Sequence, residues 1–181
     1  MTRLAFVSSP LDRNANNRTK AEFIAGRRVD STSHVVQIAG DTVRMENDRL
    51  FTLNDRPELE AIYLGEDPKG HAWFARLIDP SESLVPMRAL MIEGGLTQER
   101  LSILAQARSI LHWHESHGFC AKCGAKSLMA DAGYKRVCPE CKTEHFPRTD
   151  PVVIMAVRYG DQVLLGRQAS WPPGMFSASG T

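Results

Sequence analysis

Four cysteines of this 181-residue chain have the spacing expected of a metal site. They form two C-x2-C pairs, Cys120 with Cys123 and Cys138 with Cys141, and 14 residues separate the pairs. This spacing is typical of sites in which two short turns each offer two thiolates to one tetrahedral Zn²⁺ ion. Gly124 can adopt the positive φ that such a turn uses, and Pro139 stiffens the second pair. Because four sulfur ligands leave no open position for water, we expect the ion to fold this segment and not to perform chemistry.

The residues alone leave other uses of these cysteines open. Disulfides would need an oxidising compartment, and redox C-x-x-C motifs usually occur singly, in a thioredoxin-like βαβ pattern. A mixed cysteine and histidine site is conceivable, because four histidines crowd the same region: His112, His114, His117 and His145. We favour four-cysteine zinc and interpret the histidines as surface or packing residues, with His112 and His114 on a preceding helix.

Composition narrows the class of protein. There are 22 Lys and Arg residues against 21 Asp and Glu, which gives a net charge of +1 and argues against a generic polyanion binder. The 43% hydrophobic and 24% charged content is that of an ordinary globular protein. No run of about 18 apolar residues is present, so no membrane span is expected. The first residues are a poor secretory signal, so we expect a cytoplasmic protein.

Short apolar runs between turn residues predict a strand-rich first region, antiparallel in character. A short helix is expected near residues 20–25, and strands are expected over residues 33–39, 42–46, 49–53, 60–64 and 71–78. Thr97 then has the character of a helix N-cap. The helix after it is apolar over a wide arc, so we expect it to pack between the first region and the cysteine segment of residues 117–146.

The pattern changes again after Pro147. Residues 152–157 and 163–166 are apolar runs separated by a Gly-Asp turn, which predicts a hairpin of buried strands. The sequence as a whole therefore predicts an α+β fold: a strand-rich N-terminal domain, a four-cysteine zinc segment and a β-hairpin.

Several motifs together resemble the zinc-ribbon Nudix hydrolases of the NAD(H) diphosphatase family. These are residues 111–114 (LHWH), 119–124 (FCAKCG), 138–141 (CPEC) and 146–154 (FPRTDPVVI), with 4–6 (LAF) and 10–13 (PLDR) near the start. The resemblance implies an N-terminal NADH-pyrophosphatase-like domain over residues 1–96, a connecting helix over 97–116 and a zinc ribbon over 117–146. Residues 147–181 would begin a Nudix α/β/α domain with its opening β-hairpin.

The activity implied by this resemblance is hydrolysis of the diphosphate of NADH or NAD⁺ to nicotinamide mononucleotide and AMP. Some members of the family also remove NAD caps from RNA, and homodimers are usual. The family uses Mg²⁺ or Mn²⁺ held by glutamates on one helix. The resemblance also suggests two substrate contacts. Phe146 would stack on the nicotinamide or base, or would only fill the junction between the ribbon and the Nudix domain. Arg88 would bind a phosphate through its planar guanidinium, or would be an exposed arginine with no special role.

One departure from the family pattern matters for activity. The family's glutamate helix follows the pattern G-x5-E-x7-R-E-x2-E-E, whereas the last glutamate of this chain is Glu144 and no acidic residue follows Asp161. We therefore expect a chain truncated before its catalytic residues. It would be inactive alone, and poorly soluble or disordered beyond Pro147.

Two further hypotheses remain. The chain could be a zinc-ribbon module that binds nucleic acid or protein, although residues 120–150 hold only six basic residues against four acidic ones. Alternatively, it could be a non-catalytic remnant that dimerises with a full-length partner.

Overall fold

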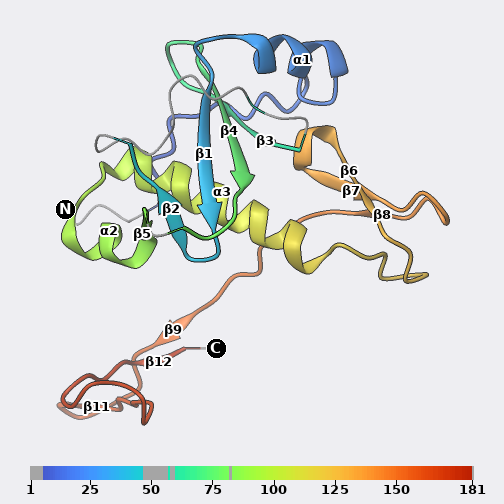
Figure 1. The fold of residues 1–181 in the computed structure, drawn as a ribbon. Helices are drawn as coiled ribbons and strands as arrows, with labels where there is room; N and C mark the ends of the chain where they lie inside the picture. Colours follow the sequence, from blue (N-terminus) through green and yellow to red (C-terminus); the bar gives the residue numbers. More distant parts are fainter. Residues whose placement is uncertain (1–5, 47–56, 58–59, 82, 181) are drawn as a thin grey trace. The chain divides into compact units, whose positions relative to one another are not determined.

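The computed structural model describes residues 6–46, 57, 60–81 and 83–180, and the expected strand over residues 49–53 lies outside this part. The described chain forms two compact units, Met1–Pro147 and Arg148–Thr181. Helices and strands alternate irregularly in the first unit, which confirms the α+β class (Figure 1). The boundaries between an N-terminal domain, a connecting helix and a ribbon remain a prediction.

A five-stranded sheet with the order β3-β4-β1-β2-β5 is the centre of the first unit. Its strands are β1 (His34–Ala39), β2 (Thr42–Arg44), β3 (Ile62–Glu66), β4 (Ala72–Leu77) and β5 (Leu84–Pro86). The pairs β1–β2, β2–β5 and β3–β4 are antiparallel, as expected. The central pair β1–β4 is parallel, from His34 opposite Trp73 to Ile38 opposite Leu77, so the expectation of an antiparallel region was wrong there. Local turn signals could not reveal this pair, because its strands are distant in the sequence.

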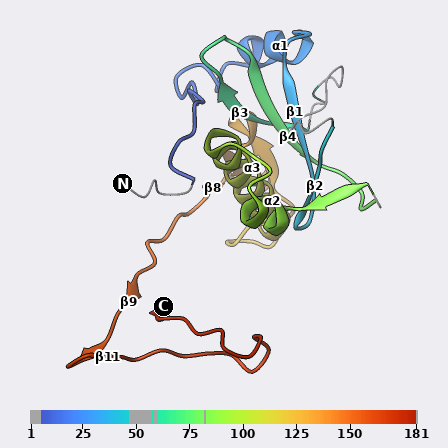
Figure 2. The ribbon, with the colours of Figure 1, turned by 90° about the vertical axis from the view of Figure 1, so that its left-hand side faces the viewer.

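Helices pack against both faces of this sheet, and Figure 2 shows α3 beside the strands and α1 at their upper end. On one face α1 (Ala21–Val29) packs through Ile24 against a cluster that includes Val35, Tyr63 and Phe74. On the other face α3 (Gln98–Ser116) contributes six residues to the larger core: Leu101, Ile103, Leu104, Ala107, Ile110 and Leu111. The short helix α2 (Met87–Glu93) precedes α3 and was not predicted.

The long helix α3 begins where the sequence indicates. Thr97 is its N-cap, and the Thr97 Oγ1 accepts a hydrogen bond of 3.3 Å from the backbone N–H of Arg100. This interaction satisfies one of the amides that the first helical turn leaves without an intrahelical partner. The apolar arc of the helix then buries eight of its residues, which fixes α3 against the sheet.

The cysteine segment of residues 117–146, called the ribbon below, has its own three-stranded antiparallel sheet. The strands are β6 (Leu128–Ala130), β7 (Lys135–Val137) and β8 (Glu144–His145), in the order β6-β7-β8. The short helix η1 (Asp131–Gly133) joins β6 to β7. Tyr134 and Met129 pack on the main core, and the hydroxyl of Tyr134 donates to the carbonyl of Leu64 at 3.2 Å. The ribbon is thereby tied to β3.

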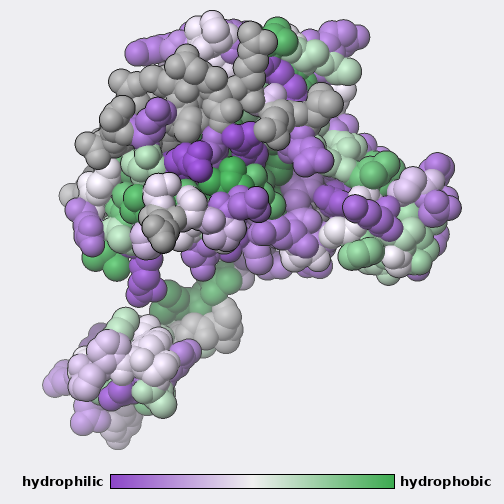
Figure 3. Space-filling model, viewed as in Figure 1, coloured by the Kyte–Doolittle hydropathy of each residue, from purple (hydrophilic) through white to green (hydrophobic). Residues whose placement is uncertain are grey.

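The second unit holds four two-residue strands, β9 (Ile154–Met155), β10 (Arg158–Tyr159), β11 (Gln162–Val163) and β12 (Ser179–Gly180). β10 and β11 form the predicted hairpin, and β9 pairs with β12. The hairpin is shorter than expected and its side chains are exposed, so the prediction of buried strands was wrong. Apolar side chains around β9 are exposed, including Val152 and Ile154. In Figure 3 hydrophobic residues are green. Burial of a strand requires a second layer of structure packed on it, and the described apolar residues of this unit have no such layer within the unit.

In the described part of the chain, no helix combines the length and the apolar character that crossing a membrane would require.

Candidate metal centre

The four predicted cysteines come together at one end of the ribbon. Their Sγ atoms all lie within 4.8 Å of one another, and all four cysteines are free thiols. The Sγ atoms of Cys120 and Cys141 are 3.6 Å apart, and those of Cys123 and Cys138 are 3.5 Å apart. A tetrahedral Zn²⁺ with bonds of about 2.3 Å places its sulfur ligands about 3.8 Å apart. The quartet therefore fits a Zn²⁺ ion, and the separations do not fit disulfides.

Two tight turns position the sulfur atoms. In the first turn the N–H of Gly124 donates to the carbonyl of Cys120 at 2.9 Å, and Gly124 has a φ of +77°. In the second turn the N–H of Lys142 donates to the carbonyl of Cys138 at 3.1 Å, and Lys142 has a φ of +60°. A left-handed residue after each pair turns the chain back on itself. In the first turn the left-handed residue is a glycine, which the sequence indicates. In the second turn it is a lysine, which the sequence does not indicate.

The surroundings of the thiols favour different protonation states. The Thr143 Oγ1 lies 3.1 Å from the Sγ of Cys141, and hydrogen bonds from the hydroxyl and N–H of Thr143 lower the pKa of Cys141 to about 6. For Cys123, the N–H of Ala125 lowers the pKa, but hydrogen bonding with the other thiols outweighs it and raises the pKa to about 12. Without an ion, four thiolates cannot coexist at this distance. A Zn²⁺ ion would bind all four as thiolates, would release their protons, and would hold the two turns together.

The four histidines of this region take different positions. His145 is closest to the cluster, with its Nε2 3.3 Å from the Sγ of Cys120. His112 is exposed beside Glu115, and His117 stacks on Trp113 with ring centroids 5.6 Å apart. His112 and His114 lie on α3, as predicted. Because a ring N–H beside a bound thiolate can donate to it, His145 is suited to orient Cys120 and is not needed as a ligand.

His114 connects the long helix to the ribbon, a role that the sequence did not reveal. Its Nε2 lies 2.7 Å from the carbonyl of Gly133, which fixes this nitrogen as the protonated one. Its Nδ1 can therefore accept a hydrogen bond, and the guanidinium of Arg136 lies 2.8 Å from it. Arg136 also donates to the Oγ and carbonyl of Ser127, at 2.8 Å and 2.7 Å. These contacts join α3 to β7, and so hold the zinc ligands of the ribbon in place relative to the large sheet.

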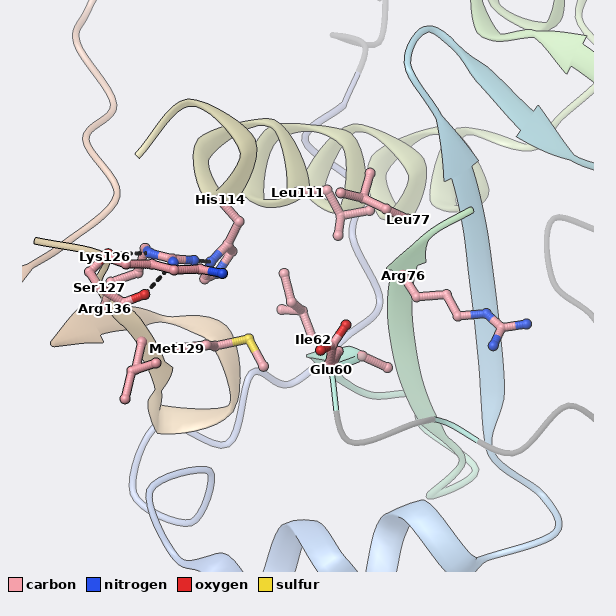
Figure 4. A pocket seen from close by; sticks show the side chains of 12 residues that line it. Glu60, Ile62, Arg76, Leu77, Leu111, His114, Lys126, Ser127, Met129 and Arg136 are labelled. Carbon is pink, nitrogen blue, oxygen red and sulfur yellow. Dashed lines mark hydrogen bonds between the residues drawn. The ribbon is translucent and has the colours of Figure 1, made fainter. Parts of the chain in front are cut away.

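A hollow of about 390 Å³ lies where the ribbon meets α3 and the sheet. In Figure 4, polar side chains gather at one end of this hollow, and the aliphatic side chains of Ile62, Leu77 and Leu111 lie at the other end together with the charged Glu60 and Arg76. The polar end consists of His114, Lys126, Ser127 and Arg136. Arg136 is already hydrogen-bonded on all three guanidinium nitrogens, so its contacts here are structural.

The two predicted substrate contacts lie at the surface. Phe146 follows β8 and is 57% exposed, so its ring is accessible for stacking. Arg88 is exposed in the first turn of α2. In the described part of the chain, no hydrogen bond or ring contact joins the two. Their roles remain predictions.

Comparisons with known proteins identify the two parts of the first unit. Residues 30–113 match the family model described as the NADH pyrophosphatase-like rudimentary NUDIX domain. Residues 115–146, which contain all four cysteines, match the NADH pyrophosphatase zinc ribbon domain. Two domains of the NADH pyrophosphatase family make up this part of the chain. The large sheet with α3 is thus the rudimentary NUDIX domain, and the ribbon is a zinc ribbon in sequence as well as in geometry.

Curated relatives carry names of one kind. The chain is 40% identical to the NAD-capped RNA hydrolase NUDT12 of Macaca fascicularis, in a match that covers 64% of this chain and 30% of that protein. The human NUDT12 is 39% identical with the same coverage. The NAD-capped RNA hydrolase NudC of Mycobacterium bovis is 37% identical, over 83% of this chain and 49% of that protein. The chain therefore spans half or less of the length of these relatives.

Proposed function

We propose that this chain belongs to a Nudix enzyme that hydrolyses the diphosphate of NADH or NAD⁺, including the NAD cap of an RNA. The observation that carries the proposal is the pairing of a rudimentary NUDIX domain with a four-cysteine zinc ribbon in one unit. In this reaction water adds to one phosphorus, and the bridging oxygen leaves with the other phosphate. The products are nicotinamide mononucleotide, in its reduced form when NADH is the substrate, together with AMP or with an RNA that carries a 5′ phosphate.

In this proposal residues 1–181 supply a scaffold and substrate contacts but not the catalytic metals. Mg²⁺ or Mn²⁺ in a diphosphatase is held by several carboxylates. The acidic residues of segment 148–181 are only two, Asp150 and Asp161. Residues 1–181 alone should therefore not cleave NAD. Phe146, exposed at the last position of the ribbon, would stack on the nicotinamide or base, and Arg88 would contact a phosphate.

Two other features belong to the same proposal. We infer a homodimer, as the resemblance implies. We also infer a cytoplasmic location, because a reducing compartment keeps the four thiols available for zinc.

The test compares the natural protein that contains this chain with residues 1–181 alone. With Mg²⁺ or Mn²⁺, the natural protein should convert NADH, NAD⁺ or NAD-capped RNA to nicotinamide mononucleotide, and residues 1–181 should not. In the natural protein, Phe146→Ala should raise KM more than it lowers kcat. Failure to cleave all three substrates would overturn the proposal. A salt-sensitive complex of residues 1–181 with an oligonucleotide, without hydrolysis by the natural protein, would favour the binding module instead.

A further inference from the structure

The rudimentary NUDIX domain contains a second group of metal-ligating side chains, far from the cysteines in the sequence. His34, Asp67 and His71 each place a ligand atom so that the three atoms lie within 4.8 Å of one another. Three different segments supply them: the start of β1, the turn after β3 and the residue before β4. These segments meet at the upper end of the sheet in Figure 1. We propose that this group is a binding site for a divalent ion of the Zn²⁺ class.

The parallel pairing of β1 with β4 puts the two histidines on one face of the sheet. His34 is opposite Trp73, and residues opposite each other on neighbouring strands point to the same side. His71 precedes Trp73 by two residues and therefore points to that side as well. The His34 and His71 rings lie 5.3 Å apart, and the His34 ring packs edge-on against Trp73 at 4.7 Å. The backbone and the tryptophan thus hold both imidazoles close together.

Asp67 is oriented by the turn that contains it. Its Oδ1 accepts hydrogen bonds from the N–H groups of Lys69 and His71, at 2.9 Å and 3.0 Å. Its Oδ2 lies 3.2 Å from the Nδ1 of His71 and 3.4 Å from the Nε1 of Trp73. One oxygen is therefore used by the turn, and the other faces the histidine. The Trp73 contact is of the outer-shell kind that orients a ligating carboxylate.

The spacing suits an ion with imidazole and carboxylate ligands. Two ligands 3.2 Å apart, each about 2.05 Å from an ion, subtend an angle of about 100° at the ion, close to tetrahedral. The third ligand would be a ring nitrogen of His34, which lies within 4.8 Å of the other two ligand atoms. The side chains of His71 and Asp67 are 32% and 16% exposed, so an ion can reach the site and keep a water as a fourth ligand.

Charges of both signs act on the site. Asp67 supplies one negative charge, and Arg100 on α3 acts on His34 with a positive one. Imidazole ligands favour Zn²⁺, Co²⁺ or Ni²⁺ over Mg²⁺ or Ca²⁺, which prefer sites made of oxygen atoms. A bound ion would fasten the β3–β4 turn to the beginning of β1. The site would then stabilise the sheet end independently of the zinc ribbon.

The test counts metal equivalents in the full chain without a histidine tag. After removal of metal by chelation and dialysis against Zn²⁺, elemental analysis should give two equivalents per chain, one for the ribbon and one for this site. Asp67→Asn keeps an acceptor for the turn but removes the anionic ligand, and His71→Ala removes a ring. Each should leave one equivalent. His112→Ala, which alters an exposed histidine outside both groups, should keep two.

Two further measurements guard against misfolding of the variants. Titration with Co²⁺ should give thiolate charge-transfer absorption for one equivalent in every variant, which reports an intact ribbon. In the unaltered chain, the second equivalent of Zn²⁺ should shift the NMR signals of the His34 and His71 rings and not that of His112. Loss of one ligand should weaken this second binding step by more than the roughly 10- to 100-fold that loss of an outer-shell partner costs. One equivalent in the unaltered chain, or ring shifts elsewhere, would overturn the proposal.

Discussion

The guanidinium of Arg136, on the zinc ribbon, lies 2.8 Å from the Nδ1 of His114, on the long helix of the rudimentary NUDIX domain. This contact joins two segments whose folds arise separately, one from sulfur ligands and the other from a hydrophobic core. The opposite nitrogen of His114 is fixed by the carbonyl of Gly133, also on the ribbon. A single imidazole thus contacts the ribbon at two points.

Replacing Arg136 should loosen the ribbon from α3. In Arg136→Met the aliphatic stem remains, but Ser127 and His114 lose three charged hydrogen-bond donors. We expect the free energy of unfolding to fall by about 2 kcal/mol, measured by urea denaturation of the zinc-loaded chain. The matched control is Lys126→Met, an exposed residue at the same hollow, which should change stability by less than about 0.5 kcal/mol. Equal effects of the two variants would contradict this role for Arg136.

The same contact should make stability depend on pH. Burial, with Arg136 adding to it, lowers the pKa of His114 below its usual 6.5, although the carbonyl of Gly133 acts in the other direction. Below pH 6.5, His114 therefore binds a proton in the unfolded chain while it stays neutral in the folded chain. The stabilising contribution of His114 is complete above pH 6.5 and decreases as the pH falls toward its folded pKa.

A glutamine at position 114 provides the comparison. Glutamine can donate to Gly133 and accept from Arg136 but does not titrate. Urea midpoints between about pH 8 and pH 5 should fall more steeply in the unaltered chain than in His114→Gln. Parallel curves would show that His114 does not contribute to the pH dependence.

Gly133 lies where the ribbon approaches β3 of the large sheet. It has a φ of +105°, and a Cβ at this position would collide with the side chain of Ile62 in β3. Gly133→Ala should therefore combine backbone strain with overpacking and cost about 2–4 kcal/mol of unfolding free energy. Gly94→Ala is the control, because Gly94 also has a positive φ, of +76°, but a Cβ there meets open space. If thermal denaturation shows that Gly133→Ala and Gly94→Ala lose the same stability, the predicted collision with Ile62 does not destabilise the fold.

Local sequence signals predicted the local features of this structure. The two C-x2-C pairs predicted the thiol cluster, because a metal site of this kind is built from two short turns. Thr97 predicted the start of α3, since an N-cap acts within one helical turn. Strands β1 and β4 were expected within one or two residues of their observed ends.

Features made by distant residues could not be predicted in this way. The parallel pairing of β1 with β4, the contact of His114 with Arg136, and the meeting of His34 with Asp67 depend on topology, not on neighbouring residues. The apolar run around Ile154 was misjudged for a related reason, because apolar character indicates a strand but not what covers it.

The parallel pairing of β1 with β4 also limits when the central sheet can form during synthesis of the chain. The parallel partner of β1, strand β4, is synthesised only after β2 and β3, and α3, which covers one face of the sheet, is synthesised later still. Until β4 is made, β1 can pair only with β2, and its other edge lacks the parallel partner. Before α3 is made, the nascent chain therefore exposes the apolar face of the sheet that this helix covers in the finished fold.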